Sequence, residues 1–344
     1  MKKKPSLVPV RSRLDALSSP ARRRLLRAFG AAAGVAALGR WPTAHAQAGA
    51  PRETLRIGYQ KYGTLTVLKA RGDLERRLAP LGLDVRWTEF PAGPQLLEGL
   101  NVGSIDFGTV GEAPPIFAQA AGAPIVYVAN QPPAPSAEAI VVPKDSPLKR
   151  VADLRGKRVA FNKGSNVHYL LLRALEQAGV PYAEVQTVYL PPADARAAFE
   201  RGSVDAWVIW DPFLAAAERQ LGARVLADGT GLVANHQFYL ASRDYAGRRP
   251  DVLKAVIEEL GRLDAWAAVH PKEVAQLLAP QIGLDLDITE RSARRFAYGV
   301  RPVDAAVARE QQKIADAFHA LKLIPRPLRI ADALPAGVQV AAKP

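Results

Sequence analysis

Two short phrases of the chain have nearly the same sequence, and each ends in a carboxylate. Residues 103–112 read GSIDFGTVGE, and residues 202–211 read GSVDAWVIWD. Each phrase predicts a turn at Gly-Ser and then a strand, so Glu112 and Asp211 both follow the carboxyl end of a strand. In two facing lobes they are expected on opposite walls of one cleft, where paired carboxylates can act as acid and base. The structural alternative is that each carboxylate stabilises the start of a helix.

Other arrangements that perform catalysis are missing from the sequence. The chain has no cysteine, and neither GxSxG nor GxxxxGK[ST] occurs. No nucleophile is recognisable beside a base. The histidines outside the first 46 residues lack metal-ligand spacing; they are His168, His236, His270 and His319. We therefore predict no catalytic residue, no metal site and no cofactor.

An alternation of strands and helices positions the two phrases. It predicts an α/β fold with mixed sheets that have helices on both faces. The predicted strands are 54–59, 83–90, 105–110, 124–130, 139–142, 158–161, 185–190, 205–210, 224–227 and 237–243. The predicted helices are 65–78, 94–102, 114–121, 165–178, 193–201, 211–222, 249–269, 271–279, 287–297 and 304–321.

Each half of this pattern contains strand, helix, strand, helix and then one copy of the phrase, which predicts two lobes of related topology. A proline-rich stretch at 131–138 and the stretch 228–237 are the expected crossings between them. We assign residues 47–138 to lobe 1, residues 139–236 to lobe 2, and residues 237–344 to a second, largely helical part of lobe 1.

Ligands of open α/β sheets bind beyond the carboxyl ends of the strands, where helix N-termini offer free N–H groups to an anion. The sequence NKGSN at 162–166 follows a predicted strand and opens a predicted helix, so it is either an anion cradle or an ordinary helix cap. Tyr59, Tyr62 and Phe238 are aromatic residues that suit either a pocket or the core. The residues predicted to bind ligand are Gln60, Gly111, Glu112, Ser136, Gly164, Ser165, Asn166, Trp210 and Asp211.

The net charge of +13 suggests a nucleic-acid-binding protein, but its location argues against one. Residues 1–46 hold ten Lys and Arg and one acid, which leaves a net charge of +4 elsewhere. This basic segment, an apolar run at 28–39 and the small-x-small site Ala44-His45-Ala46 predict a signal peptide. An arginine run at 22–24 favours twin-arginine export, and a Sec leader is the alternative. With no cysteine to carry a lipid anchor, we expect a free, soluble periplasmic protein.

The chain resembles the periplasmic aliphatic sulfonate-binding proteins of ABC importers. The resemblance rests on long runs such as WTEFPAGPQLLEGLNVGSIDFGTVGEAPPIFAQAAG, VADLRGKRVAFNKGSNVHYLLLRALEQAG and YLPPADARAAFERGSVDAWVIWDPFLAAAE. It implies a type II periplasmic-binding-protein fold, a two-lobe clamp in which each lobe is a mixed sheet flanked by helices. It also implies a monomer that captures an alkanesulfonate by hinge closure and delivers it to an inner-membrane permease for sulfur supply.

A sulfonate is a monoanion with three acceptor oxygens, which suits helix N-termini and neutral donors better than paired arginines. Gln60, Ser165 and Asn166, with the main chain of Gly111 and Gly164, are the expected donors, and Trp210 is the expected apolar wall. The family often has aspartate where this chain has Glu112 and a second serine where it has Asn166, which affects ligand preference.

Other functions stay open from the sequence. Receptors for taurine, nitrate or a thiamin-precursor pyrimidine share the fold. An exported hydrolase that uses Glu112 and Asp211 is an alternative from another class, and a sensor or structural protein that reuses the clamp is a third.

Overall fold

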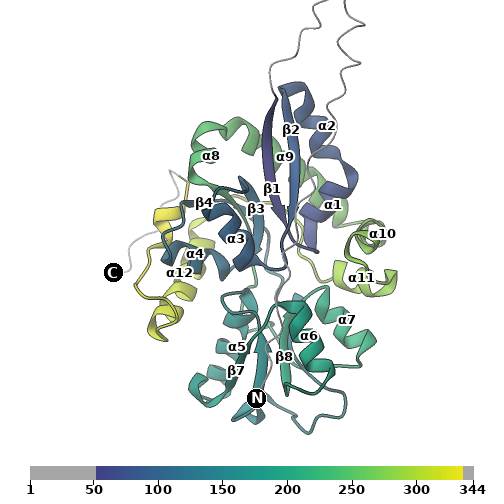
Figure 1. The fold of residues 1–344 in the computed structure, drawn as a ribbon, viewed down its shortest axis with the longest axis vertical. Coiled ribbons are helices and arrows are strands. Elements are labelled where there is room, and N and C mark those ends of the chain that lie inside the picture. Colours follow the sequence, from purple (N-terminus) through teal and green to yellow (C-terminus); the bar gives the residue numbers. More distant parts are fainter. Residues whose placement is uncertain (1–51, 336–344) are drawn as a thin grey trace, which may run out of the picture. The chain divides into compact units, whose positions relative to one another are not determined.

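The computed structural model describes residues 52–335 (Figure 1). The chain divides into two units, residues 1–49 and residues 50–344, and the described residues all belong to the second. The predicted signal peptide, residues 1–46, therefore lies outside the described residues, as does the end of the chain after residue 335. Within residues 52–335, no helix is long and apolar enough to span a membrane.

The first sheet contains β1 (Glu53–Tyr59), β2 (Leu83–Glu89), β3 (Phe107–Gly111), β4 (Ile125–Asn130) and β10 (Gln237–Ser242), in the order β2-β1-β3-β10-β4. β1 is parallel to β2 and β3, whereas β10 is antiparallel to β3 and β4, so the sheet is mixed. Its early helices are α1 (Gly63–Arg71), α2 (Asp73–Leu78), α3 (Gly93–Asn101) and α4 (Pro114–Ala120).

The second sheet contains β5 (Glu138–Val142), β6 (Arg158–Phe161), β7 (Gln186–Tyr189), β8 (Ala206–Trp210) and β9 (Arg224–Asp228), in the order β7-β6-β8-β5-β9. Its helices are α5 (Asn166–Gln177), α6 (Pro192–Glu200) and α7 (Phe213–Gln220), drawn in teal and green in Figure 1. β6 is parallel to β7 and β8, and β5 is antiparallel to β8 and β9, which repeats the pattern of the first sheet. The predicted α/β fold with two mixed sheets is confirmed.

The repeated phrase has the same structural task in both sheets. The side chain of Asp106 accepts hydrogen bonds from the backbone N of Arg56 at 2.9 Å and from its guanidinium. Asp205 accepts the same bonds from Arg158, with the backbone N at 2.8 Å. Gly103 and Gly202 both have φ +69°, a left-handed conformation that favours glycine. Each phrase therefore ties the turn before its strand to the neighbouring parallel strand.

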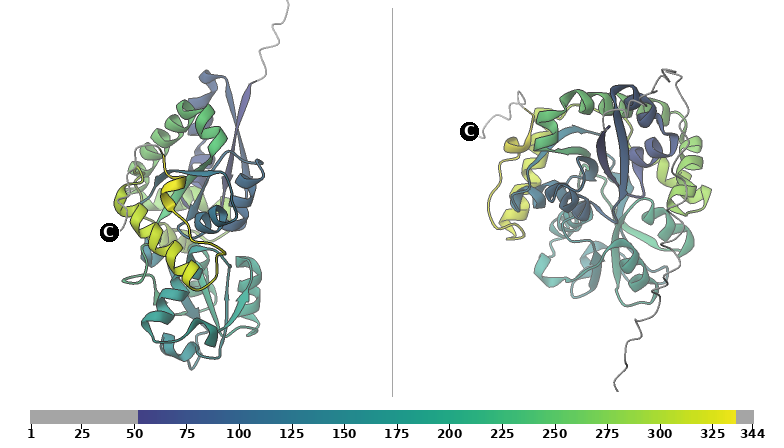
Figure 2. Two further views of the ribbon diagram at one scale, coloured as in Figure 1. Left: turned by 90° about the vertical axis from the view of Figure 1, so that its left-hand side faces the viewer. Right: turned by 45° about the horizontal axis from the view of Figure 1, so that its top comes forward.

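The helices after β10 are α8 (Arg243–Arg248), α9 (Pro250–Ala267), α10 (Pro271–Ile282), α11 (Leu286–Ala293) and α12 (Ala305–Ala320). α9 packs on α1 and α2, but α11 packs on α7 beside the second sheet. α12, yellow in Figure 2, contacts helix α5 of the second sheet, because Phe318 near its end lies 5.5 Å from His168 and 5.9 Å from Tyr169, measured between ring centroids. The C-terminal helices thus contact the first sheet and its helices and also the helices α5 and α7 of the second sheet.

Two chain segments cross between the sheets side by side. Ala134 N donates to Ala234 O at 3.0 Å, and Gln131 N donates to Gln237 O at 2.8 Å. We call residues 131–137 the first crossing and residues 229–236 the second crossing. We name each sheet with its own helices lobe 1 and lobe 2, and we propose that the lobes divide at 138/139 and 236/237.

Candidate functional site

A cavity of about 30 Å³ lies between the two lobes. The start of α1, both crossings, the start of α5, the end of β8 and the segment after α11 all contribute to its wall. None of the described residues that line it is Lys, Arg or His. The lining residues are Tyr62, Gly63, Thr64, Gln131, Pro132, Ala134, Ala137, Asn166, Trp210, Asp211, Asn235, Gln237, Phe296 and Ala297.

Two helices begin at this cavity without a capping side chain. Neither Tyr62, which precedes α1, nor Ser165, which precedes α5, makes a side-chain cap hydrogen bond, and neither helix has an acidic residue in its first turn. The first N–H groups of a helix have no partner within it, and together they carry a partial positive charge. The start of α1 and the start of α5 therefore give the cavity an electropositive wall without a basic side chain.

Aromatic rings form the apolar wall. Tyr62 and Phe296 lie with ring centroids 6.2 Å apart, and Trp210 packs edge-on against Phe213 behind the cavity. Tyr62 Oη donates to Gln237 Oε1 at 2.7 Å, which holds the ring at the start of α1. The cavity therefore combines N–H groups on one side with aromatic surface on another, an arrangement that suits an anion with an apolar tail.

Asp211 is buried in the cavity wall and is paired there. Its Oδ1 accepts from Ala215 N at 3.0 Å, which caps α7, and Arg295 lies 3.3 Å from its Oδ2. Burial raises the pKa of Asp211 to about 6, and the charge of Arg295 opposes that rise. The structural alternative for this carboxylate, a helix cap, is therefore observed, together with an ion pair to Arg295 in the segment after α11.

The side-chain amide of Asn166 donates its hydrogen bonds to groups within the protein. Its Nδ2 donates to Asn235 Oδ1 at 3.0 Å and to Glu138 Oε2, while Asn235 Nδ2 donates to Ala134 O at 2.8 Å. Burial raises the pKa of Glu138, and repulsion from Glu112 adds to the rise. Because both Nδ2 hydrogens have partners, the Asn166 side chain offers the cavity an acceptor, and a donor at this position comes from the α5 backbone.

The predicted site residues lie in three places. Asn166, Trp210 and Asp211 line the interlobe cavity. Gln60, Gly111, Gly164 and Ser165 are buried beside it, where the Gln60 amide donates to Thr109 O at 3.0 Å and the Ser165 hydroxyl donates to Asn162 O at 2.7 Å. Ser136 is exposed on the first crossing and does not line the cavity.

Glu112 lies elsewhere. It lines a different cavity, with Tyr169, residues 231–234 and Glu310, and its Oε2 accepts from His236 N at 3.0 Å in the second crossing. Asp211, in contrast, donates its backbone N to Ala137 O in the first crossing at 2.8 Å. The expectation that Glu112 and Asp211 face each other across one cleft is therefore wrong, because the related lobes place equivalent strand ends against different crossings.

The sequence did not single out the cavity residues of the crossings or of the segment after α11. Gln131, Asn235 and Gln237 are polar, and their only signal is a position in a predicted crossing; Thr64 is polar too, and its only signal is a position just before the predicted helix 65–78. Phe296 carries no signal, because it lies near the end of the predicted helix 287–297. Tyr62 lines the cavity, whereas Tyr59 and Phe238 belong to the core.

Comparison with known proteins agrees with this geometry. The sequence model of a family described as NMT1/THI5 like matches residues 79–274. A putative aliphatic sulfonates-binding protein of Escherichia coli is 49% identical over 81% of this chain and 87% of its own length. The chain belongs to the aliphatic sulfonate-binding protein family.

Solved structures of the same family have the same fold. The alkanesulfonate-binding protein of Xanthomonas axonopodis pv. citri, bound to MOPS, is 44% identical with a TM-score of 0.79, over 83% of this chain and 99% of that one. The periplasmic aliphatic sulphonate-binding protein of Escherichia coli is 46% identical with a TM-score of 0.75, over 85% of this chain and 95% of that one. The aliphatic sulfonate-binding family thus accounts for nearly all the described residues.

Proposed function

We propose that this protein is the periplasmic solute receptor of an ABC importer and that it captures aliphatic sulfonates in the interlobe cavity. The observation that carries the proposal is the pair of uncapped helix starts, α1 and α5, at a cavity whose described lining contains no basic side chain. Free N–H groups suit a monoanion with three acceptor oxygens. The family relatives named as sulfonate-binding proteins support the same assignment.

Tyr62, Trp210 and Phe296 supply the surface for the apolar tail. Sulfate and nitrate have no tail to use this surface. Asp211 already pairs with Arg295 and caps α7, so it is poorly placed to serve as the ammonium acceptor that taurine would favour. Alkanesulfonates with a longer tail therefore fit the wall best.

Capture requires the lobes to separate and close again. A cavity of about 30 Å³ has room for roughly one water molecule, less than a sulfonate needs. The two crossings are the natural hinge, and closure brings the start of α5 to Gly111 at the end of β3. The closed form is the state that an inner-membrane permease would recognise, with the receptor acting as a monomer without a lipid anchor and without chemistry on the ligand.

Glu112 and Asp211 line different cavities, which leaves a hydrolase without its carboxylate pair. The chain also has no cysteine to serve as a nucleophile. These points support a binding function over an enzymatic one.

Titration calorimetry and thermal unfolding with hexanesulfonate, hexanoate, hexanol, sulfate, nitrate and taurine test the proposal. The first three share the tail and differ in the head, and sulfate supplies a head without a tail. We expect hexanesulfonate to bind tightest and to raise the melting temperature most, since a ligand at 100 times its Kd adds about 2.7 kcal/mol to stability. Tighter binding of nitrate, taurine or hexanol would overturn the assignment.

A further inference from the structure

Two amide side chains in the wall of the interlobe cavity have occupied nitrogens and open oxygens. They belong to Gln131 in the first crossing and to Asn166 at the start of α5, and each residue is 7% exposed. Each nitrogen donates two hydrogen bonds within the protein, whereas neither oxygen accepts one from a described residue. The enclosed side-chain atoms that lack a partner within residues 52–335 do not include these two oxygens. Both oxygens are therefore accessible acceptors at the cavity.

The carboxylate of Asp264 sets the orientation of the Gln131 amide. Asp264 lies on α9 and is fully buried. Its Oδ1 accepts from Thr64 Oγ1 at 2.6 Å, and its Oδ2 accepts from Gly299 N at 2.8 Å. The Gln131 amide lies 2.9 Å from both Asp264 Oδ2 and Thr64 Oγ1. An ionised carboxylate only accepts, and the one hydroxyl hydrogen of Thr64 is already donated, so the Gln131 atom between them is Nε2. Its Oε1 is the end of the amide that is left for the cavity.

A backbone carbonyl sets the orientation of the Asn166 amide in the same way. Ala134 O can only accept, and Asn235 Nδ2 donates to it at 2.8 Å, so Asn235 Oδ1 is an acceptor. The Asn166 atom that lies 3.0 Å from this oxygen is then Nδ2, whose other hydrogen goes to Glu138 Oε2. The assignment is the same for a charged and a neutral Glu138, because Asn235 alone decides it. Asn166 Oδ1 is thus left for the cavity.

Both oxygens lie beside the helix starts that form the electropositive wall. Asn166 is the first residue of α5, and Gln131 is hydrogen-bonded to Thr64, the second residue of α1. A sulfonate oxygen cannot bond to either amide oxygen, because all of them are acceptors, but a donor on a carbon near the head group can. A hydroxyl suits this position better than an ammonium, since the helix starts disfavour a second positive charge and a neutral amide supplies no counter-charge.

We propose that the interlobe cavity selects alkanesulfonates that carry a hydroxyl near the head group, through Gln131 Oε1 and Asn166 Oδ1. Asp264 is then a positioning residue, because it does not line the cavity and acts by turning the Gln131 amide. Without Asp264, the hydroxyl of Thr64 can accept from Gln131 Nε2 or donate to Oε1, so both amide orientations become available. This selection rests on the proposed sulfonate function and names the ligand group that the two amides recognise.

Titration calorimetry of the full chain with 2-hydroxyhexane-1-sulfonate and hexane-1-sulfonate tests the selection. We expect the hydroxyl to lower the Kd about threefold to tenfold, the range of one neutral hydrogen bond. The analogue 2-fluorohexane-1-sulfonate has no donor at that carbon and should show no such gain, and 2-aminohexane-1-sulfonate should bind more weakly than the hydroxyl ligand. A hydroxyl ligand that binds no tighter than hexane-1-sulfonate, or an amino ligand that binds tighter than both, would overturn the selection alone. Failure of all four to bind would overturn the proposed function, and the selection with it.

The ratio of the Kd for hexane-1-sulfonate to that for the hydroxyl ligand isolates this recognition, because a change in closure or in stability affects both ligands alike. Gln131→Met and Asn166→Ala should each reduce the ratio, and together they should bring it to about one. Asp264→Ala should reduce it as far as Gln131→Met does, and combining these two changes should reduce it little further. A parent-like ratio in Gln131→Met/Asn166→Ala would overturn the selection, and one in Asp264→Ala would overturn the positioning role.

Thr66→Val is the matched control. Its hydroxyl is buried near the same helix start and donates to Gln60 O and Tyr62 O, but Thr66 lies outside the cavity lining, so the ratio should keep the parent value. If Asp264→Ala fails to fold, the side-chain amide signals of Gln131 in NMR spectra of the parent protein, assigned by their loss in Gln131→Met, test the same contact. We expect slow solvent exchange of both amide hydrogens, and fast exchange would overturn the role of Asp264.

Discussion

The guanidinium of Arg295 lies 3.3 Å from Asp211 Oδ2 and 2.6 Å from Glu218 Oε2, so it joins the segment after α11 to the end of β8 and to α7. Arg295 is 18% exposed, and the Asp211 side chain is fully buried in the cavity wall. The pair thus supplies a counter-charge to the carboxylate nearest the proposed anion site. With the lobe division and the closure that we propose, it also links lobe 1 to lobe 2.

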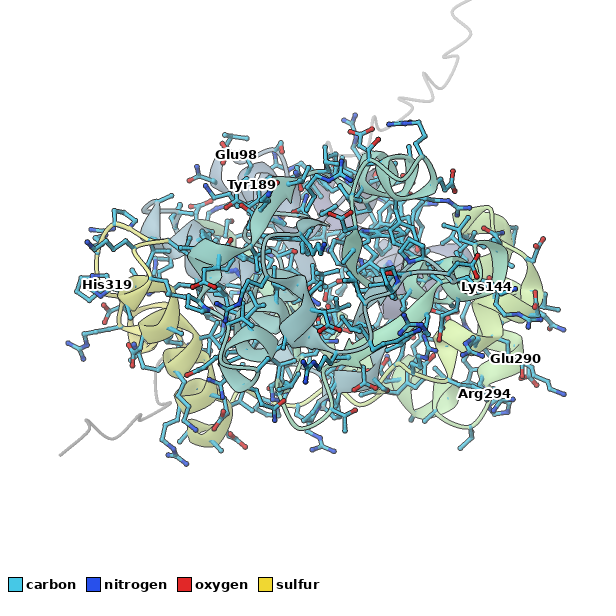
Figure 3. The ribbon with its side chains drawn as sticks, turned by 90° about the horizontal axis from the view of Figure 1, so that it is seen from below. Glu98, Lys144, Tyr189, Glu290, Arg294 and His319 are labelled. Carbon is cyan, nitrogen blue, oxygen red and sulfur yellow. The ribbon has the colours of Figure 1, made fainter. Side chains whose placement is uncertain are left out.

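We expect Arg295→Gln to raise the Kd for hexanesulfonate at least tenfold, about 1.4 kcal/mol. The change leaves a buried carboxylate uncompensated beside an anion and removes a contact between the lobes. Titration calorimetry at pH 7.5 measures the effect. Arg294→Gln is the control, because Arg294 pairs with Glu290 at the outer face of α11 (Figure 3).

A second substitution separates charge from structure. Asp211→Asn in the Arg295→Gln background removes the unpaired charge, and we expect it to recover most of the lost affinity. If the double variant binds as weakly as Arg295→Gln alone, Arg295 acts by holding the lobes together and the charge argument fails.

Gly111 is predicted to control closure. A Cβ at this position would lie 2.9 Å from Cγ of Asn166, and φ at Gly111 is not positive, so the constraint is space alone. Gly111→Ala should therefore oppose closure and weaken sulfonate binding, while the melting temperature without ligand changes little. Small-angle scattering with and without hexanesulfonate measures the compaction. Gly247→Ala meets no atom within 4 Å and should close normally; full ligand-induced compaction in Gly111→Ala would contradict the prediction.

We predict that the protein loses stability at low pH because of the buried His168 ring. The ring is fully buried between Phe117, Phe161 and Phe318, and burial lowers its pKa to about 3, with a smaller contribution from Lys163. A histidine with a lowered pKa contributes stability above its unfolded pKa of about 6.5, and that stability is lost as pH falls towards 3. This one group reduces the free energy of unfolding by up to about 1.4 kcal/mol per pH unit.

Urea unfolding between pH 4.5 and 7.5 measures how the free energy of unfolding changes with pH in the parent protein and in His168→Gln. The buried carboxyls Glu112 and Asp211 have raised pKa values and therefore act in the opposite direction, so the comparison between the two proteins isolates His168. We expect a flatter acid limb in His168→Gln. Parallel curves would show that His168 is not the group responsible.

We predict that Phe296 contacts the apolar tail of the ligand and so makes affinity depend on tail length. It lines the interlobe cavity opposite Tyr62, so Phe296→Ala should raise the Kd for hexanesulfonate about fivefold to thirtyfold and change that for methanesulfonate little. Phe213→Ala is the matched control, since Phe213 packs behind Trp210 outside the described lining. An equal loss for both ligands would mean that Phe296 acts on closure.

The positions of strands and helices along the chain could be predicted closely from the sequence, because the residue patterns that indicate them are local. The strand at 158–161 and the helix starting near 165 agree with β6 and α5. The predicted helix 65–78 is two helices, since Gly72 adopts φ +65° and ends α1. The sequence does not predict α8, because the six residues at 243–248 are too few to show a helical pattern.

The site was harder to predict, because it depends on contacts between distant segments. The start of α5 follows from the Gly-Ser-Asn sequence alone, so Asn166 was found. Phe296 and Asn235 reach the cavity only through the packing of the C-terminal segment and the crossings, which no local pattern encodes. The repeat predicts Glu112 at the wrong cavity, because it indicates the position along a strand but not which crossing that strand end meets.

The strand β10 lies between β3 and β4, although it follows the whole second sheet in the chain. β3 and β4 are each hydrogen-bonded to β10, so the first sheet is incomplete until residues 237–242 have been synthesised. The second sheet needs only residues 138–228 and can form earlier on the ribosome. The order of synthesis therefore favours folding of lobe 2 first. The sheet of lobe 1 is completed last, when β10 inserts between β3 and β4.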